Sequence, residues 1–278
     1  MKLFLNLLKT PSFVFGVTLF LATLGVALVL PWFYDVDTVG RAGTPYLPPS
    51  AEHLLGTNHL GVDFVSLLIT GLRASLYVGL LAGCIATLLG TFLGVYAGYK
   101  GGWIDDLINL VTNLFIVIPY FVVLILISAS LEEGRSLQLI AVIIGLTTWP
   151  WTTRSVRAQA ASLKSRDHIG LAKVNGCGTF QIVTLHILPY LLSYVFMVFI
   201  IQIAAGILVE ASISMIGLGP YDSISLGVLM DDAMKNEALG DGIWWAFIPS
   251  TILITAVVFA LYTLNTSMEG VFNPRLRK

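Results

Sequence analysis

Three polar side chains stand inside long apolar stretches of this sequence: Asn113, Gln202 and Glu210. Polar groups within a membrane-spanning helix normally face a bundle interior or an aqueous cavity, because their exposure to lipid is unfavourable. Each of the three is therefore a candidate for contact with a solute on a translocation pathway. We favour a structural alternative, in which Asn113 and Gln202 join neighbouring helices. Glu210 would then accept hydrogen bonds from Ser212, Ser214 or a partner subunit.

A polar, basic segment at 164–184 interrupts the apolar pattern. Asp167 is able to cap a helix that begins near His168, because its carboxylate accepts hydrogen bonds from unpaired N–H groups. The helix would carry a small apolar face of the kind that fits a groove, made of Ile169, Leu171 and Ala172. Glycines after it permit sharp backbone turns, and these are Gly176 and Gly178. From the residues alone, the segment is either a docking surface or a solvated loop.

The sequence contains no pattern typical of catalysis or of metal binding. The motifs HExxH, GxSxG and the phosphate-binding GxxxxGK[ST] do not occur, so we expect neither a catalytic residue nor ATP binding by this chain. Cys84 lies in an apolar stretch and Cys177 in the polar segment, which argues against a disulfide between them. The His and Cys spacing fits no zinc site. A formal net charge of −1 gives no basis for nucleic-acid binding.

The composition is that of a polytopic membrane protein. Of the 278 residues, 56% are hydrophobic and only 11% are charged, whereas soluble domains carry about 25% charged residues. Since about 20 apolar residues cross a bilayer as a helix, we predict an all-α protein with six transmembrane helices. They are expected at 13–32, 74–97, 107–131, 136–153, 185–209 and 242–268, with the fourth extending toward 162 and the fifth toward 216.

Glycines and prolines add detail to these predicted helices. Gly90, Gly94 and Gly98 recur at a spacing of four residues, which predicts close packing against a neighbouring helix. Pro119 and Pro249 are positions where a span could bend. The first apolar stretch is longer than the roughly 7–15-residue core of a signal peptide and no cleavage pattern follows it, so we expect a retained helix.

The distribution of positive charge predicts the orientation of the bundle. With the N-terminus in the cytoplasm, 11 of the 15 Lys and Arg residues fall in cytoplasmic segments and 4 outside, as the positive-inside rule requires. Both termini and the segment 164–184 are then cytoplasmic, and the protein lies in the plasma or inner membrane. We divide the chain into 1–73, a first helix with an extracytoplasmic segment, and 74–278, a transmembrane core. A second outer segment, 219–241, is acidic.

Several stretches of the sequence resemble the motifs of one transporter family. Gly176 and the HILP sequence at 186–189, separated by nine residues, resemble part of its signature E-A-A-x-x-x-G-x9-I-x-L-P. Similar in order and spacing to further family motifs are LGTNHLGVD at 55–63, AGYKGGWID at 97–105, EASISMIGLG at 210–219 and NPRLR at 273–277. The family is that of the permeases of binding-protein-dependent ABC importers. The chain most resembles the second permease subunit of dipeptide, oligopeptide and nickel-type importers.

The resemblance implies a type I ABC importer permease (MetI-like) fold and a role as half of a translocation pathway. A homologous permease would complete a heterodimer, two cytoplasmic ATPases would bind ATP and Mg²⁺, and an extracytoplasmic binding protein would deliver the cargo. This chain would bind no cofactor itself, and membrane lipid would surround it. Peptide is the expected cargo, with oligosaccharides or nickel as alternatives. A stand-alone secondary transporter or channel is the alternative from a different class.

The resemblance also assigns the segment 164–184 to coupling with the ATPases. Gly170 stands where the family signature has glutamate, so docking would depend more on apolar contacts and on basic side chains. An exposed ion pair contributes only ~0.2–1 kcal/mol, so the loss of the glutamate need not abolish assembly. The candidate coupling residues are Arg166, Asp167, His168, Gly170, Leu171, Ala172, Lys173 and Gly176.

Overall fold

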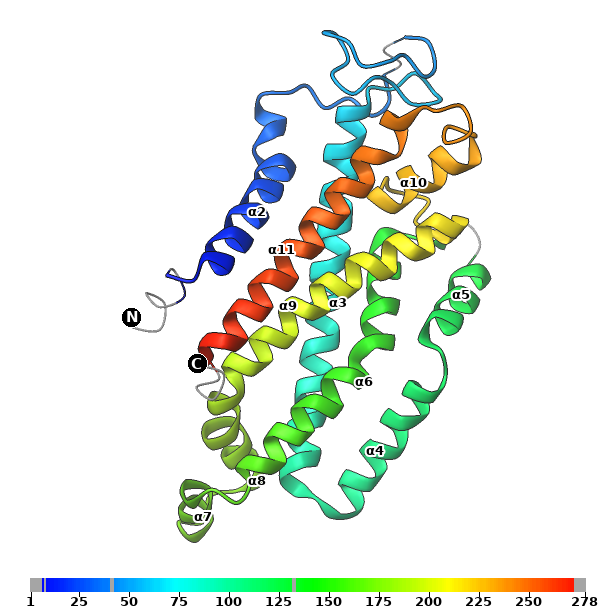
Figure 1. Cartoon of the computed structure of the whole chain (residues 1–278). Helices are drawn as coiled ribbons and strands as arrows, with labels where there is room; N and C mark the ends of the chain where they lie inside the picture. Colours follow the sequence, from blue (N-terminus) through cyan, green and yellow to red (C-terminus); the bar gives the residue numbers. More distant parts are fainter. Residues whose placement is uncertain (1–6, 8, 41–42, 132–133, 273–278) are drawn as a thin grey trace.

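The computed structural model describes residues 7, 9–40, 43–131 and 134–272, which form an elongated bundle of helices (Figure 1). Among these residues the only extended pairing is an isolated bridge between Thr57 and Asp63, so the prediction of an all-α protein is confirmed. The long helices are α2 Pro11–Leu28, α3 Phe64–Lys100, α4 Gly102–Val117, α5 Tyr120–Ser130, α6 Leu137–Leu163, α9 Leu188–Ile213 and α11 Ile248–Phe272.

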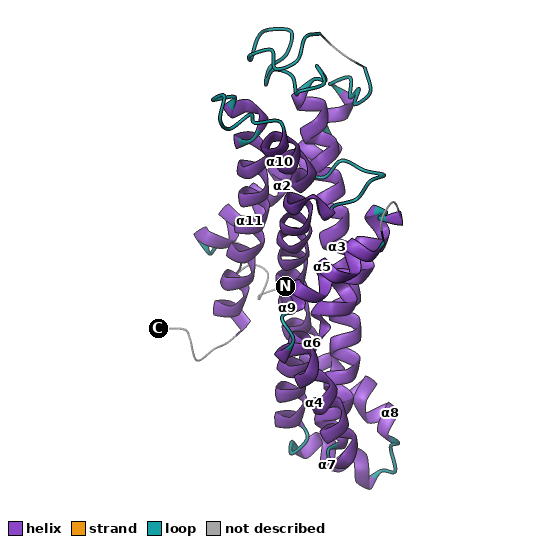
Figure 2. Ribbon diagram, turned by 90° about the vertical axis from the view of Figure 1, so that its right-hand side faces the viewer, coloured by secondary structure: helices purple, strands orange, loops and turns teal. Residues whose placement is uncertain are grey.

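α3 is the central helix of the bundle. α6 and α9 pack along it, and α11 packs against both α9 and α2 (Figures 1 and 2). A Cβ on Gly94 would lie 2.7 Å from the carbonyl oxygen of Thr153, and one on Gly98 would lie 2.6 Å from that of Arg157. Both distances are too short for a side chain. The close packing predicted for the stripe of Gly90, Gly94 and Gly98 is therefore confirmed, and α6 is the helix that it meets.

Length and composition determine which helices are able to cross a membrane. Four of the described helical segments meet both criteria, and α4 with α5 provides a fifth if the pair is one span. The chain bends by 76° between α4 and α5, at Pro119, because proline cannot continue an α-helix. α6 is too polar for these criteria, yet it lies within the bundle beside α3 (Figure 1), in agreement with a six-helix architecture.

Helix capping explains the largest difference from the predicted boundaries. α3 begins at Phe64 rather than at 74, because the Asp63 carboxylate accepts a hydrogen bond from the Ser66 N–H at 3.0 Å. The long loop that precedes α3 therefore ends at residue 63. The predicted extensions of the fourth and fifth helices are confirmed, since α6 ends at Leu163 and α9 reaches Ile213.

The outer segment 219–241, which the sequence suggested to be a loop, contains a further helix. α10, Leu226–Lys235, follows Ser225, whose hydroxyl oxygen accepts a hydrogen bond from the Val228 N–H. The predicted bend at Pro249 is wrong. This proline is the second residue of α11, where a missing N–H breaks no helical hydrogen bond.

Candidate functional site

A short helix, α7 (Asp167–Val174), stands at one end of the bundle (Figures 1 and 2). It lies between the end of α6 and a π-helical turn, Ile182–Ile187, that leads into α9. The short helix predicted within 164–184 is therefore confirmed. Asp167 in its first turn and Lys173 in its last turn both suit the helix dipole. A helix of this length is not stable alone, so contacts with the bundle must hold it in place.

Two apolar side chains hold α7 against the bundle. Ile169 is 0% exposed and Ala172 is 4% exposed. Both belong to a buried cluster that includes Tyr99 of α3 and Val156 of α6. The Lys173 ammonium adds a cation–π contact at 5.4 Å from the centre of the Tyr99 ring. The prediction that Ile169 and Ala172 face a groove of a partner is therefore wrong, because both side chains are buried within this chain.

Three large apolar side chains are exposed on α7 and on the short helix α8 (Thr179–Gln181), beside polar ones such as Lys173. Leu171 is 65% exposed, Val174 is 85% exposed and Phe180 is 78% exposed. Gly170 is exposed as well, and a Cβ at this position would meet no atom within 4 Å. Of the predicted apolar face, Leu171 alone is available to a partner. Val174 and Phe180 were not predicted, and their large apolar side chains within a polar segment are the signal that could have identified them.

The residues at the two ends of α7 differ in part from the prediction. The N-cap residue is Arg166, and no side chain caps the helix by a hydrogen bond. The predicted cap by Asp167 is wrong, because the helix already includes this residue in its first turn. Gly176 has φ +78°, a conformation that favours glycine, so the turn predicted there is confirmed. Gly178 has φ −69° and ψ 162°, which any residue adopts, so no glycine is required.

Pro189 accounts for the wide turn before α9. It is the second residue of α9, which begins directly after the π-helical turn Ile182–Ile187. Its ring would clash with the carbonyl four residues earlier in a regular α-helix, and the wider turn relieves this contact. His168 joins α7 to the same region, since its Nε2 lies 3.3 Å from the carbonyl oxygen of His186. Its ring centre lies 4.7 Å from that of Tyr190.

Glu210 is completely buried in the bundle. Its Oε1 accepts hydrogen bonds from the hydroxyls of Ser214 at 2.7 Å and Ser225 at 2.5 Å. Its Oε2 accepts one from Ser75 at 3.2 Å. The carboxylate thus joins α9 to α3 and to the start of α10. These contacts agree with the structural alternative for Glu210, although Ser212 donates instead to the backbone of its own helix.

Gln202 joins α9 to α6. Its Nε2 donates to Thr152 Oγ1 at 2.7 Å and to the Thr148 carbonyl oxygen at 3.3 Å. The same residue lines a cavity of about 430 Å³ between the two helices. Gln202 is therefore both a structural link and a group that faces open space, and its contact with a substrate stays a prediction.

Two polar contacts join α4 to α6. Asn113 is exposed on α4, and its Oδ1 accepts a hydrogen bond from Arg154 Nη2 at 3.0 Å. Asp105 forms an ion pair with Arg157 at 2.5 Å. Asn113 thus has the structural role that we favoured, and its partner Arg154 lies on α6, the helix that also carries the partners of Gln202.

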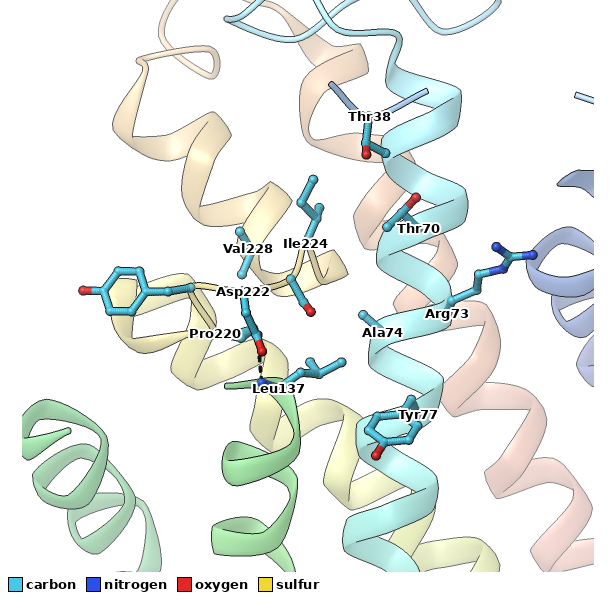
Figure 3. A pocket seen from close by; sticks show the side chains of 12 residues that line it. Thr38, Thr70, Arg73, Ala74, Tyr77, Leu137, Pro220, Asp222, Ile224 and Val228 are labelled. Atoms are coloured by element: carbon cyan, nitrogen blue, oxygen red, sulfur yellow. Dashed lines mark hydrogen bonds between the residues drawn. The ribbon is translucent and has the colours of Figure 1, made fainter. Parts of the chain in front are cut away.

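At the opposite end of the bundle, a hollow of about 730 Å³ opens between α3, the start of α6 and the segment around 220–228 (Figure 3). Asp222 closes part of one wall by accepting a hydrogen bond from the Leu137 N–H at 2.9 Å. The Arg73 side chain points away from the hollow (Figure 3), and its Nε donates to the Ala27 carbonyl oxygen of α2. The hollow is thus an open feature of the outer end.

Two histidines in the outer region each face one carboxylate. His53 Nδ1 lies 3.1 Å from Asp63, and His59 Nδ1 lies 2.7 Å from Asp232. Burial raises the pKa of the Asp232 carboxyl, and His59 beside it opposes this rise. Burial and a hydrogen bond to Asp63 raise the pKa of Tyr34 to about 12. Over the described part of the chain, no group of three or more His, Cys, Asp or Glu side chains is arranged to hold a metal ion.

The fold and the short helix at its end define a class, the multi-pass helical membrane proteins that expose a short helix outside the bundle. Residues 90–278 match the family described as "Binding-protein-dependent transport system inner membrane component". The chain therefore belongs to this family, and the resemblance found in its motifs is confirmed.

Individual relatives of the chain are permease proteins of transport systems. The chain is 30% identical to the dipeptide transport system permease protein DppC of Bacillus subtilis, over 95% of this chain and 82% of that protein. It is 29% identical to the oligopeptide transport system permease protein OppC of Mycobacterium bovis, over 88% of this chain and 83% of that protein. A putative peptide transport system permease protein of Brucella suis is 30% identical, over 98% of this chain and 90% of that protein.

Proposed function

We propose that this protein forms half of the translocation pathway of an ATP-driven importer and that its cargo is a peptide. Family membership supports the transport role. The names of the relatives, which are dipeptide, oligopeptide and peptide permeases, favour peptide over oligosaccharide or nickel. The chain lacks the GxxxxGK[ST] motif, so ATP and Mg²⁺ are bound and ATP is hydrolysed by two partner ATPases rather than by this subunit.

The ATPases dock on α7. The observation that carries this proposal is the division of α7 into two apolar faces, one buried in the bundle and one exposed. Leu171 and Val174 form the exposed face of α7, and we name them, together with the exposed Phe180 of α8, the α7 patch. Exposed apolar side chains of this kind are suited to protein–protein contacts, and family membership supports an ATPase groove as the partner.

A displacement of α7 reaches α9 through the buried cluster. Ile169 and Ala172 of α7 share this cluster with Ile187 of the π-helical turn and Leu191 of α9. Close-packed interiors have low compressibility, so a displacement of one packed side chain is passed on to its neighbours. Closure of the ATPases would therefore move α9 together with α7 and change the side on which the pathway is open.

The α7 end of the bundle faces the cytoplasm, and both termini lie on the same side. The positive-inside rule supports this orientation, since Lys100, Lys164, Arg166 and Lys173 all lie at the α7 end. A homologous permease completes a heterodimer and supplies the other half of the pathway. The extracytoplasmic binding protein meets the outer end, where the hollow of Figure 3 opens.

Co-purification tests the docking proposal. The double substitution Leu171→Asp with Val174→Asp places two carboxylates in the α7 patch and replaces only exposed residues. We expect the variant to retain the companion permease and to lose the ATPases. Leu239→Asp is the matched control, because Leu239 is 52% exposed at the outer end and its variant should keep all partners. Full retention of the ATPases by the double variant would exclude docking on α7.

A further inference from the structure

Two cavities open along the same face of α9. One, of about 430 Å³, lies between α6 and α9, and the other, of about 830 Å³, lies at the α7 end between α6, α9 and α11. Tyr194, Val198 and Ile201 line both cavities. The two cavities are therefore neighbours along α9, and we name them together the α9 groove.

The polar residues along most of the α9 groove carry no charge. Those of α6 recur every three or four residues, which places them on one face of that helix. They are Thr148, Thr152, Ser155 and Gln159. Thr147 also lines the groove beside Thr148, and α9 adds Ser193 and Gln202. Among the residues that line the groove, charge appears only at the α7 end, on Arg166 and Glu269.

The internal hydrogen bonds leave several acceptors facing the groove. The hydroxyls of Thr148 and Ser155 donate to carbonyl oxygens of α6 at 2.9 Å and 3.0 Å, so their oxygen lone pairs remain available. Asn265 of α11 lines the groove and is 8% exposed, and its Oδ1 has no hydrogen-bond partner in the described structure. A buried acceptor without a partner is unfavourable, so this site suits a ligand that brings N–H donors.

Given the proposed function, we infer that the α9 groove is this chain's wall of the substrate path and that it holds a peptide by its backbone N–H groups, without selecting for side-chain charge. Neutral acceptors replace the water that these N–H groups lose. A fixed charge in a weakly polar path would retain peptides of opposite charge and exclude those of like charge. A path needs binding that is weak enough for release. A nickel ion would require imidazole or similarly strong ligands, which the uncharged part of the groove does not offer.

A charge that is added after folding tests this inference. Ser155→Cys is made in a background with Cys84→Ser and Cys177→Ser, and the complete transporter is reconstituted in vesicles with its binding protein. The cysteine is then modified with a cationic, an anionic or a neutral methanethiosulfonate reagent. Uptake is measured for an acidic, a neutral and a basic tripeptide of equal length. Ser162→Cys is the matched control, since Ser162 is exposed on the same helix and lines neither cavity.

We expect the cationic adduct at position 155 to lower the uptake ratio of basic to acidic peptide about tenfold, and the anionic adduct to raise it by a similar factor. The neutral adduct and all adducts at position 162 should leave the ratio unchanged. Uptake of all three peptides with an unaltered ratio after modification at 155 would overturn the inference and leave the proposed function standing. Failure of the cysteine at position 155 to react with the methanethiosulfonate reagents would likewise overturn the inference and leave the proposed function standing. If the unmodified transporter takes up no peptide at all, the proposed function fails as well.

Discussion

The Ser225 hydroxyl donates a 2.5 Å hydrogen bond to Glu210 Oε1 while its oxygen accepts one from the Val228 N–H. One serine thus caps α10 and ties it to α9. Ser75 of α3 has the same double role, because its oxygen accepts a hydrogen bond from the Leu226 N–H and its hydroxyl donates one to Glu210 Oε2. The buried carboxylate therefore fixes three helices as one unit at the outer end.

Glu210→Ala should destabilise this unit. The hydroxyls of Ser75, Ser214 and Ser225 would lose their acceptor, and each buried polar group left without a partner costs about 1–3 kcal/mol. We expect a clear fall in the thermal stability of the purified complex. Glu210→Gln keeps one carboxamide oxygen and should lose less. The measurement is the melting temperature of the complex, and a stability of Glu210→Ala equal to that of the wild type would contradict the role given to this carboxylate.

The two glycines after α7 provide a matched pair for the turn. A Cβ at Gly176 or at Gly178 would meet no atom within 4 Å, but only Gly176 has a positive φ. Gly176→Val therefore introduces backbone strain of about 1–2 kcal/mol, and Gly178→Val does not. We expect Gly176→Val to reduce ATP-dependent uptake or ATPase docking while insertion into the membrane continues. Equal uptake by the two variants would show that the turn at Gly176 has no part in coupling.

A pair of glutamate substitutions separates the buried face of α7 from its exposed surface. Ala172→Glu places a carboxylate in the buried cluster, which is strongly unfavourable, so we expect α7 to detach from the bundle and the ATPases to be lost. Gly170→Glu introduces the residue of the family signature at an exposed position and should keep docking and transport. Limited proteolysis within 164–184 and co-purification of the ATPases report the two effects. Normal protease resistance of Ala172→Glu would contradict the assignment of this face to the core.

The orientation of the bundle is tested by labelling from each side. Ser165 is exposed at the α7 end and Ser50 is exposed in the outer loop. In a background without Cys84 and Cys177, Ser165→Cys should react with an impermeant maleimide only when the cytoplasmic side is accessible. Ser50→Cys should react from the outside of intact cells. The opposite pattern would reverse the topology proposed for the whole chain.

The sequence was sufficient for the all-α class and for the order of the apolar helices along the chain, because the length of an apolar stretch determines whether it spans a bilayer. It was not sufficient for the start of α3. Asp63 begins this helix by a hydrogen bond of its side chain, in a stretch that is less apolar than the span itself. The helix α10 was missed for the same reason, since its cap at Ser225 lies in a segment that its acidic residues made resemble a loop.

The site was predictable in position but not in orientation. The polar segment and Gly176 indicated a short helix and a turn, and both are present. Ile169 and Leu171 are equally apolar, so the sequence alone could not tell which one meets the bundle. The polar spacing of α6 from Thr148 to Gln159 is visible in the sequence. Its meaning depends on the position of α9, because a polar face lines a cavity only where a second helix encloses the space.

Peptide uptake by the purified transporter tests the central claim most directly. The chain, its companion permease and the two ATPases are reconstituted in vesicles with the binding protein and a labelled peptide. We predict uptake that requires ATP on the side of α7 and that is lost when Leu171→Asp and Val174→Asp are combined, while the Leu239→Asp control transports normally. Uptake that proceeds without ATP, or that persists undiminished in the double variant, would contradict the claim that this subunit is an ATP-driven permease coupled through α7.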